Sequence, residues 1–332
     1  MNFRNLPKIE LHRHIELCLR KETIKELAPQ FGIELPDEKT YEDRFLILEP
    51  MKDLGSALNK FLDTQKLLAS PEILERIAFE AAEDCYNEGT RIVEFRYAPT
   101  FVQLNHEHMS FDVIHESLVK GLKRAEEMYP IATGLICIIQ RILPVEVGRS
   151  VTEFAIDHKD TMIGLDLADN EEGFDSKPFS DFFLKARDAG LGITVHAGEA
   201  NLPKSPRYVT DAIEYLGAQR IGHGIQIHRD PAVMKSVIDK NIVLEVCPKS
   251  NWLTNAISDL NDHPIRTLYD AGVPITLNTD DPGVFNTDLN QEYQIVADRF
   301  GFEEDDFKKM NEIAYKASFI SEEKKSKVWP VN

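Results

Sequence analysis

The stretch G-I-T-V-H-A-G-E, residues 192–199, is a short run of small and β-branched residues that ends directly in a histidine and a carboxylate. Such a run is typical of a strand in a parallel sheet, and similar runs recur along the chain. On this basis we predict eight strands, at residues 8–12, 91–98, 132–139, 162–166, 192–196, 220–223, 242–247 and 274–278.

The segments between these runs carry apolar residues at helical spacing. Helices are therefore predicted at residues 72–88, 112–127, 179–189, 231–239 and 264–271. Eight strands that alternate with helices indicate parallel β–α units, and 332 residues suit a closed α/β barrel of the (β/α)8 TIM type. An open, doubly wound sheet is the alternative. No G-x-G-x-x-G or Walker loop follows any strand, which counts against the nucleotide-binding form of that sheet.

The chain has no low-complexity tract, no repeat of fixed period and no Gly/Ser linker. We therefore expect a single barrel domain over residues 1–332. The gap between the first two strands is too long for one crossover, so residues 15–90 are expected to hold extra helices that cap the C-terminal mouth of the barrel. Residues 289–332 are expected to form a helical tail.

Charge and hydropathy argue against two classes of partner. The chain has 38 Lys and Arg against 56 Asp and Glu, a net charge of −18. This surplus repels phosphate backbones and lipid head groups, so we expect no nucleic-acid or membrane partner. No apolar stretch approaches the ~20 residues that span a bilayer, and the N-terminal M-N-F-R-N-L-P-K-I-E carries charges where a signal peptide has an apolar run. The expectation is a cytoplasmic protein that acts on a small molecule.

Chemically active side chains follow the predicted strands at their C-terminal ends, where a (β/α)8 barrel builds its active site. They are His12, His14, His196, Glu199, His223, Asp280 and Asp281. Because His12 and His14 alternate along one strand, both imidazoles can point into the barrel. Three neutral imidazoles and one carboxylate suit a zinc ion, with a water that ionises near neutral pH completing the coordination.

Two of these residues can move or hold protons beside the predicted metal site. Glu199 lies three residues past His196 and can reach the barrel mouth as a proton donor and acceptor without being a ligand. His223, on the neighbouring strand, is placed to hold the attacking water or to help deprotonate it. Other hydrolytic sites are not indicated, because the fourth strand ends without a lysine and the chain has neither P-C-x-x-C nor G-x-S-x-G.

Seven motifs resemble those of a known family. In order they are L-P-K-I-E-L-H-R-H, V-E-F-R-Y-A-P, D-L-A-D, V-H-A-G-E, R-I-G-H-G, C-P-x-S-N and N-T-D-D-P, from Leu6 to Pro282. In order and spacing they resemble the adenosine deaminase family of metal-dependent barrel hydrolases. The resemblance implies an enzyme of purine metabolism that hydrolyses a C–N bond of a cyclic amidine. Its reaction would be zinc-dependent deamination of a 6-aminopurine nucleoside, adenosine or a relative, to the 6-oxo nucleoside and ammonia.

The resemblance also implies a role for the residues of the motifs. One Zn²⁺ would be held by His12, His14, His196 and Asp280. Glu199 would protonate N1 of the purine, and His223 would orient and activate the attacking hydroxide. Asp281 would contact the attacking water and the purine N7.

The substrate-binding residues that the resemblance implies are His14, Glu16, Leu54, Leu58, Phe61, Asp169 and Asp281. Glu16 stands where the family places a carboxylate that contacts a sugar hydroxyl. The three apolar residues resemble the hydrophobic lid over the purine pocket, and ordinary core packing is the alternative reading of that stripe.

Four positions depart from the family pattern. Leu17 and Cys18 follow Glu16 where the family has glycine and a small residue, so Leu17 is expected to change the backbone or the space beside the sugar site. Arg13 stands in the middle of the His-x-His pair. Asp169 replaces the glycine that ends D-L-A-G, which adds a charge at the pocket rim. These departures bear on the group attached at N9 or at the ribose 5′ position and leave the metal chemistry intact.

The residues leave other functions open. The same chemistry can act on adenine itself or on a 5′-modified adenosine such as aminofutalosine, with Glu16 and Leu17 as the discriminating positions. A non-catalytic nucleoside-binding protein would have lost a metal ligand or the acid, and this chain retains them all. A metal-dependent esterase or lactonase on the same barrel often uses two metals, which the donor set here does not indicate.

Overall fold

Eight parallel strands form one sheet in sequence order, from β1 to β8. The computed structural model describes residues 3–52 and 61–330. The strands are β1 (Lys8–His14), β2 (Thr90–Tyr97), β3 (Ala132–Gln140), β4 (Met162–Ala168), β5 (Gly192–Ala197), β6 (Arg220–His223), β7 (Val243–Val246) and β8 (Ile275–Leu277). The backbone N–H of Asp280 donates to the carbonyl of His12 (3.0 Å), and the N–H of His14 donates to the carbonyl of Asp280 (2.9 Å). These two bonds join the end of β1 to the segment after β8 and close the barrel.

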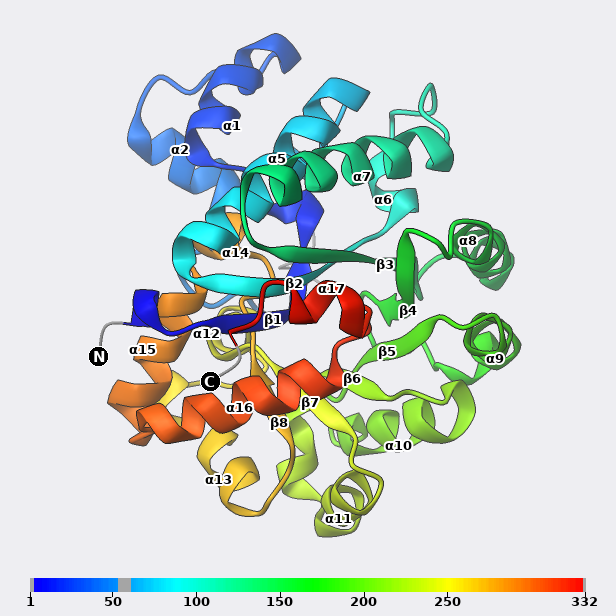
Figure 1. Cartoon of the computed structure of the whole chain (residues 1–332), viewed down its shortest axis with the longest axis vertical. Helices are drawn as coiled ribbons and strands as arrows, with labels where there is room; N and C mark the ends of the chain where they lie inside the picture. Colours follow the sequence, from blue (N-terminus) through cyan, green and yellow to red (C-terminus); the bar gives the residue numbers. More distant parts are fainter. Residues whose placement is uncertain (1–2, 53–60, 331–332) are drawn as a thin grey trace.

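Helices alternate with the strands along the chain, and Figure 1 shows α8 to α11 on the outside of strands β3 to β7. The helices that precede or follow strands β2 to β8 are α5 (Pro71–Glu88), α6 (Pro99–Gln103), α7 (Phe111–Met128), α8 (Val145–Asp157), α9 (Ser180–Asp188), α10 (Ser205–Leu216), α11 (Pro231–Asp239), α12 (Pro248–Leu253), α13 (Ile265–Asp270) and α14 (Pro282–Phe285). The predicted (β/α)8 barrel is confirmed, and the open-sheet alternative is wrong. Every predicted strand is present with bounds within two residues of those expected.

The remaining helices lie near the two ends of the chain. Between β1 and α5 are α1 (Lys21–Leu27), α2 (Glu38–Phe45) and α4 (Leu62–Gln65), and after α14 are α15 (Leu289–Phe300), α16 (Glu304–Ala317) and α17 (Glu322–Ser326). No helix within residues 3–52 and 61–330 has the length and apolar character needed to cross a membrane. The division into one domain with a cap and a tail stays a prediction.

A layer of buried ion pairs fills the interior of the barrel. Arg96 of β2 contacts Oδ2 of Asp166 on β4 (2.8 Å) and Oε2 of Glu245 on β7 (2.7 Å). Arg220 of β6 contacts Oε1 of Glu245 (2.7 Å) and Oε2 of Glu94 on β2 (2.6 Å). All five side chains are buried. Because a buried charge is costly unless it is paired, the layer stabilises the barrel only when it is complete.

The segment after α16 covers the N-terminal end of the barrel, beneath this layer. Oε1 of Glu94 accepts hydrogen bonds from the hydroxyl of Ser318 (2.7 Å) and from the backbone N–H groups of Phe319 and Ile320. The guanidinium of Arg220, the first residue of β6, lies 3.8 Å from the centroid of the Phe319 ring. Figure 1 shows α16 and α17 crossing in front of the strands at this end. Glu94 thus ties the tail to the ionic layer.

We expect Glu94→Ala to lower the free energy of unfolding by about 3–5 kcal/mol, because the variant leaves Arg220 and the donors of the tail without their carboxylate. The control is Ser318→Ala, which removes one of these hydrogen bonds and should cost about 1 kcal/mol. Urea denaturation followed by circular dichroism measures both values. Equal losses in the two variants would show that the ion pair contributes nothing beyond the contacts of the tail.

Candidate active site

Four side chains converge at the C-terminal end of the barrel, and we call them the metal cluster: His12 and His14 from β1, His196 from β5, and Asp280 after β8. Oδ1 of Asp280 lies 3.3 Å from Nε2 of His12 and 3.3 Å from Nε2 of His14. Nε2 of His14 lies 3.4 Å from Nε2 of His196. Ligands about 2.0–2.1 Å from a tetrahedral metal ion lie about 3.3–3.4 Å from one another. The spacing of these atoms therefore matches a site for one metal ion.

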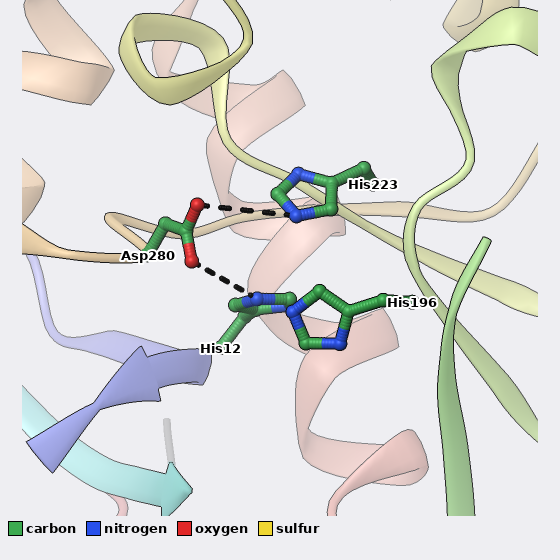
Figure 2. Close-up of side chains that lie close together, drawn as sticks. All are labelled: His12, His196, His223 and Asp280. Carbon is green, nitrogen blue, oxygen red and sulfur yellow. Dashed lines mark ion pairs between the residues drawn. The ribbon is translucent and has the colours of Figure 1, made fainter. Parts of the chain in front are cut away.

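A fifth residue, His223, also lies against this cluster, as Figure 2 shows. Its Nε2 is 3.9 Å from Oδ2 of Asp280, an oxygen that already accepts a hydrogen bond from the hydroxyl of Ser250 (2.6 Å). Nε2 of His14 is closer to Asp280, at 3.3 Å from the other oxygen, Oδ1. The distances favour His14 over His223 as a ligand of the same ion.

Two buried carboxylates contact the Nδ1 atoms of His12 and His196 and so orient these rings. Nδ1 of His12 lies 2.8 Å from Oε2 of Glu245, and Nδ1 of His196 lies 3.0 Å from Oδ2 of Asp166. A ring that donates from Nδ1 presents the lone pair of Nε2 to a metal. Burial, partly offset by Asp166, lowers the pKa of His196 to about 4, which keeps that ring neutral as a ligand must be.

Sequence reasoning did not identify these orienting carboxylates as site residues. Asp166 and Glu245 each stand inside a short apolar strand, in the runs L-D-L and L-E-V. An acid in such a run is the signal that points to them, because a carboxylate buried in a parallel sheet needs a cationic or hydrogen-bonding partner.

Two further carboxyl groups at the site favour their protonated form. Oε1 of Glu199 accepts a hydrogen bond from the hydroxyl of Thr254 (3.0 Å), and its Oε2 lies 3.6 Å from Nε2 of His223. Burial and the neighbouring Asp280 raise the pKa of Glu199 well above its usual value. Burial and Asp280 likewise raise the pKa of Asp281. A buried carboxyl that keeps its proton can act as a proton donor.

A cavity of about 310 Å³ opens beside these groups. Its lining includes the predicted substrate-binding residues that the structure describes: His14, Glu16, Phe61, Asp169 and Asp281. The other two, Leu54 and Leu58, lie outside the described residues. Oε1 of Glu16 accepts a hydrogen bond from the N–H of Ala98 (3.0 Å), while Oε2 has no hydrogen-bond partner among residues 3–52 and 61–330. Burial raises the pKa of Glu16 to about 8.

Leu17, where the family pattern has a glycine, changes the space in the cavity rather than the backbone. It ends the 3-10 turn Ile15–Leu17, and its φ is not in the left-handed region. The side chain packs with Phe61, Leu253 and Phe285 and forms part of the cavity wall. An apolar group thus takes the place beside Glu16 that a glycine would leave open.

Two other departures, Asp169 and Arg13, affect the site differently. Asp169 has a φ of 82°, a conformation that favours glycine, and its Oδ2 accepts a hydrogen bond from Nε2 of Gln140 (3.0 Å). Both residues line the cavity. Arg13 forms ion pairs with Glu88 (3.2 Å) and Glu10 (3.1 Å), neither of which lines the cavity. Asp169 therefore changes the pocket, whereas Arg13 stabilises the surroundings of β1.

A model of the adenosine deaminase family matches residues 7–330. The chain belongs to the adenosine deaminase family. The matched range contains the metal cluster, Glu199, His223 and Asp281, together with the described residues of the cavity.

Curated relatives and solved structures match over nearly the whole chain. An adenosine deaminase of Clostridium perfringens (strain SM101) is 38% identical over 335 residues, covering 99% of this chain and 98% of the relative. An adenosine deaminase of Plasmodium falciparum is 37% identical, covering 98% and 89%. The crystal structure of adenine deaminase from Arthrobacter aurescens superposes with a TM-score of 0.87 at 26% identity, covering 96% of each chain. That of an amidohydrolase from Burkholderia ambifaria with bound Zn has a TM-score of 0.87 at 25% identity, covering 98% and 89%.

Gly222→Ala tests the position of His12. A methyl group at Gly222 would lie 2.8 Å from Cε1 of His12, so the ring must shift from its present position. We expect the affinity for zinc to fall about 10–100-fold, as it does when the support of a ligand is disturbed. Competition with a chromogenic chelator measures the affinity. Gly32→Ala is the control, because a methyl group at Gly32 has open space around it; unchanged affinity in the Gly222 variant would mean that His12 is not a ligand.

Proposed function

We propose that this protein is a zinc-dependent hydrolase that converts adenosine, or a closely related 6-aminopurine nucleoside, to the 6-oxo nucleoside and ammonia. The observation that carries this proposal is the buried Glu199, with its raised pKa, beside the metal cluster in one cavity. The adenosine deaminases of 34–38% identity over almost the full chain support the choice of substrate.

The residues present fit a zinc ion. Nε2 of His12 is buried and has no hydrogen-bond partner within the part of the chain that the structure describes, although it faces the other donors of the cluster. His12, His14, His196 and Asp280 would hold the ion, since three imidazoles and a carboxylate are a donor set that zinc prefers. When bound, zinc lowers the pKa of a water molecule to about 7 and so supplies a nucleophile near neutral pH.

The chain's own residues hold the purine and move the protons. Glu199 donates its proton to N1, which makes C6 a better electrophile for the attacking oxygen. Asp281 holds N7 with the proton that burial and Asp280 keep on its carboxyl group. His223 orients the attacking oxygen on the face of C6 turned toward the metal cluster. A purine ring that fills the cavity displaces water from it, which strengthens each of these interactions.

The lining of the cavity favours a neutral nucleoside over a nucleotide. It includes the acids Glu16, Glu199, Asp169 and Asp281, and no Lys or Arg is among its described residues. Without a basic side chain the described lining offers a phosphate group no ion pair, whereas the unpaired Oε2 of Glu16 can bind a sugar hydroxyl. The likeness to an adenine deaminase structure makes adenine the second candidate substrate.

We expect the zinc-loaded protein to convert adenosine to inosine. The change in ultraviolet absorbance measures the rate of this reaction. Glu199→Gln should lower kcat by about 10²–10⁴-fold, because the amide cannot donate the proton to N1. In the wild type, kcat/KM should fall as the pH rises through the raised pKa of Glu199, since the protonated form is the active one. Zinc content, measured by atomic absorption, is the control, and full activity of a zinc-loaded Glu199→Gln would contradict the proposal.

A second experiment separates the two candidate substrates. Glu16→Ala should lower kcat/KM for adenosine about 10–100-fold, because it removes the hydrogen bond between the Glu16 carboxyl group and a sugar hydroxyl. The same change should leave kcat/KM for adenine almost unaltered, since adenine has no sugar. Glu16→Gln, which keeps a polar group of the same size, should retain most of the activity with adenosine. Higher kcat/KM for adenine than for adenosine in the wild type would instead make adenine the substrate.

A further inference from the structure

Behind His223, on the side away from the metal cluster, three buried groups form a chain of hydrogen bonds. Nδ1 of His223 lies 3.1 Å from Nδ2 of Asn251 on α12. Oδ1 of Asn251 lies 3.2 Å from Nε2 of His263, which follows the 3-10 turn Leu260–Asp262. Nδ1 of His263 lies 3.0 Å from the backbone nitrogen of Ile265. The three side chains are at most 4% exposed, so water does not compete for these bonds.

One backbone amide sets the direction of the whole chain. The N–H of Ile265 can only donate, so Nδ1 of His263 accepts and the proton of that ring is on Nε2. Burial also lowers the pKa of His263 to about 3, consistent with a ring that carries a single proton. The Nε2–H needs an acceptor, which fixes Oδ1 of Asn251 toward His263 and the amide NH2 toward His223. The same logic then applies to His223: its Nδ1 accepts, and its proton is on Nε2.

That proton faces the reaction site. Nε2 of His223 lies 3.6 Å from Oε2 of Glu199 and 3.9 Å from Oδ2 of Asp280. A ring nitrogen that carries a proton has no lone pair with which to bind a metal or to accept a proton. The backbone of His223 adds to this fixed arrangement, since its φ of 61° is in the left-handed region and is held there by its surroundings.

We propose that His223 acts as a hydrogen-bond donor that holds the attacking oxygen, not as the base that deprotonates it, and that Asn251 and His263 are positioning residues that impose this tautomer. The inference rests on the proposed function and goes beyond it, because it assigns roles to two residues that lie outside the cavity. The sequence leaves two roles open for His223, holding the attacking water or helping to deprotonate it, and the inference selects the first. The proton of the attacking water would then pass to bulk water, since a bound zinc ion would lower the pKa of that water to about 7.

The first test is spectroscopic and does not depend on turnover. Zinc-loaded protein with ¹⁵N-labelled histidine rings distinguishes protonated from unprotonated ring nitrogens in a long-range ¹H–¹⁵N correlation spectrum. The His223 signals are those that vanish in His223→Gln. We expect an unprotonated Nδ1 and a protonated Nε2 in the wild type. A proton on Nδ1, or a doubly protonated ring, would overturn the proposal.

The second test changes the direction of the chain. Asn251→Asp replaces the donor with an acceptor, so the proton of His223 should move to Nδ1 and kcat for adenosine should fall about 10–100-fold with KM little changed. His263→Gln, whose amide nitrogen can replace Nε2 as the donor, should keep the wild-type tautomer and most of kcat. His263→Leu, which has no donor at this position, should lose the wild-type tautomer of His223 and most of kcat. Zinc content and the thermal unfolding temperature are recorded for each variant.

The outcomes separate the two proposals. If the wild type turns over no purine but shows the expected tautomer, the proposed function fails and the fixed tautomer remains. If adenosine is deaminated but Asn251→Asp and His263→Leu keep full kcat, or lose it with an unchanged His223 spectrum, the positioning roles are wrong. A loss of kcat that follows the tautomer across all the variants supports the inference.

Discussion

The site depends on two backbone hydrogen bonds that close the barrel. Asp280 donates to the carbonyl of His12 and accepts from the N–H of His14, although more than 260 residues separate Asp280 from both histidines. The closure therefore brings three of the four candidate ligands together before any metal is involved. It requires a φ of 67° at Asp280, a strained conformation that persists because the neighbouring strands determine it. Strain of this kind is stored where it positions functional groups.

The ionic layer beneath the site links stability to chemistry. Glu245 binds Arg96 and Arg220 with its two oxygens and also holds Nδ1 of His12. The same carboxylate thus neutralises buried guanidinium groups and orients an imidazole. Because a buried charge without its partner is strongly destabilising, a change at Glu245 would disturb the core and the ligand together. The contacts that hold the barrel together here are therefore also contacts that orient a candidate ligand.

The sequence predicts the barrel well, and it predicts that the candidate ligands follow the strands, because both predictions depend on local signals. Short β-branched runs identify the strands, and polar residues at their ends identify the site. Partnerships across the barrel are not local: nothing near Glu245 in the sequence shows that it faces His12. The hydrogen bonds that Asn251 accepts from His263 and donates to His223 likewise depend on how the segment after β7 folds back. For Leu17 the sequence indicates a departure, but only packing shows that it fills space with an ordinary backbone.

Two adjacent carboxylates show how the fold divides one chemical group into two functions. Burial acts to raise the pKa of Asp280, but the imidazoles of His12 and His14, each with Nε2 3.3 Å from Oδ1, outweigh it and hold the pKa well below its usual range. Asp281 is just as buried, and its Oδ1 has no hydrogen-bond partner among the described residues, so burial and the charge of Asp280 raise its pKa. An ionised carboxylate suits a metal, and a protonated one suits a purine nitrogen. The sequence D-D is symmetrical, and the difference arises entirely from which residue faces the imidazoles.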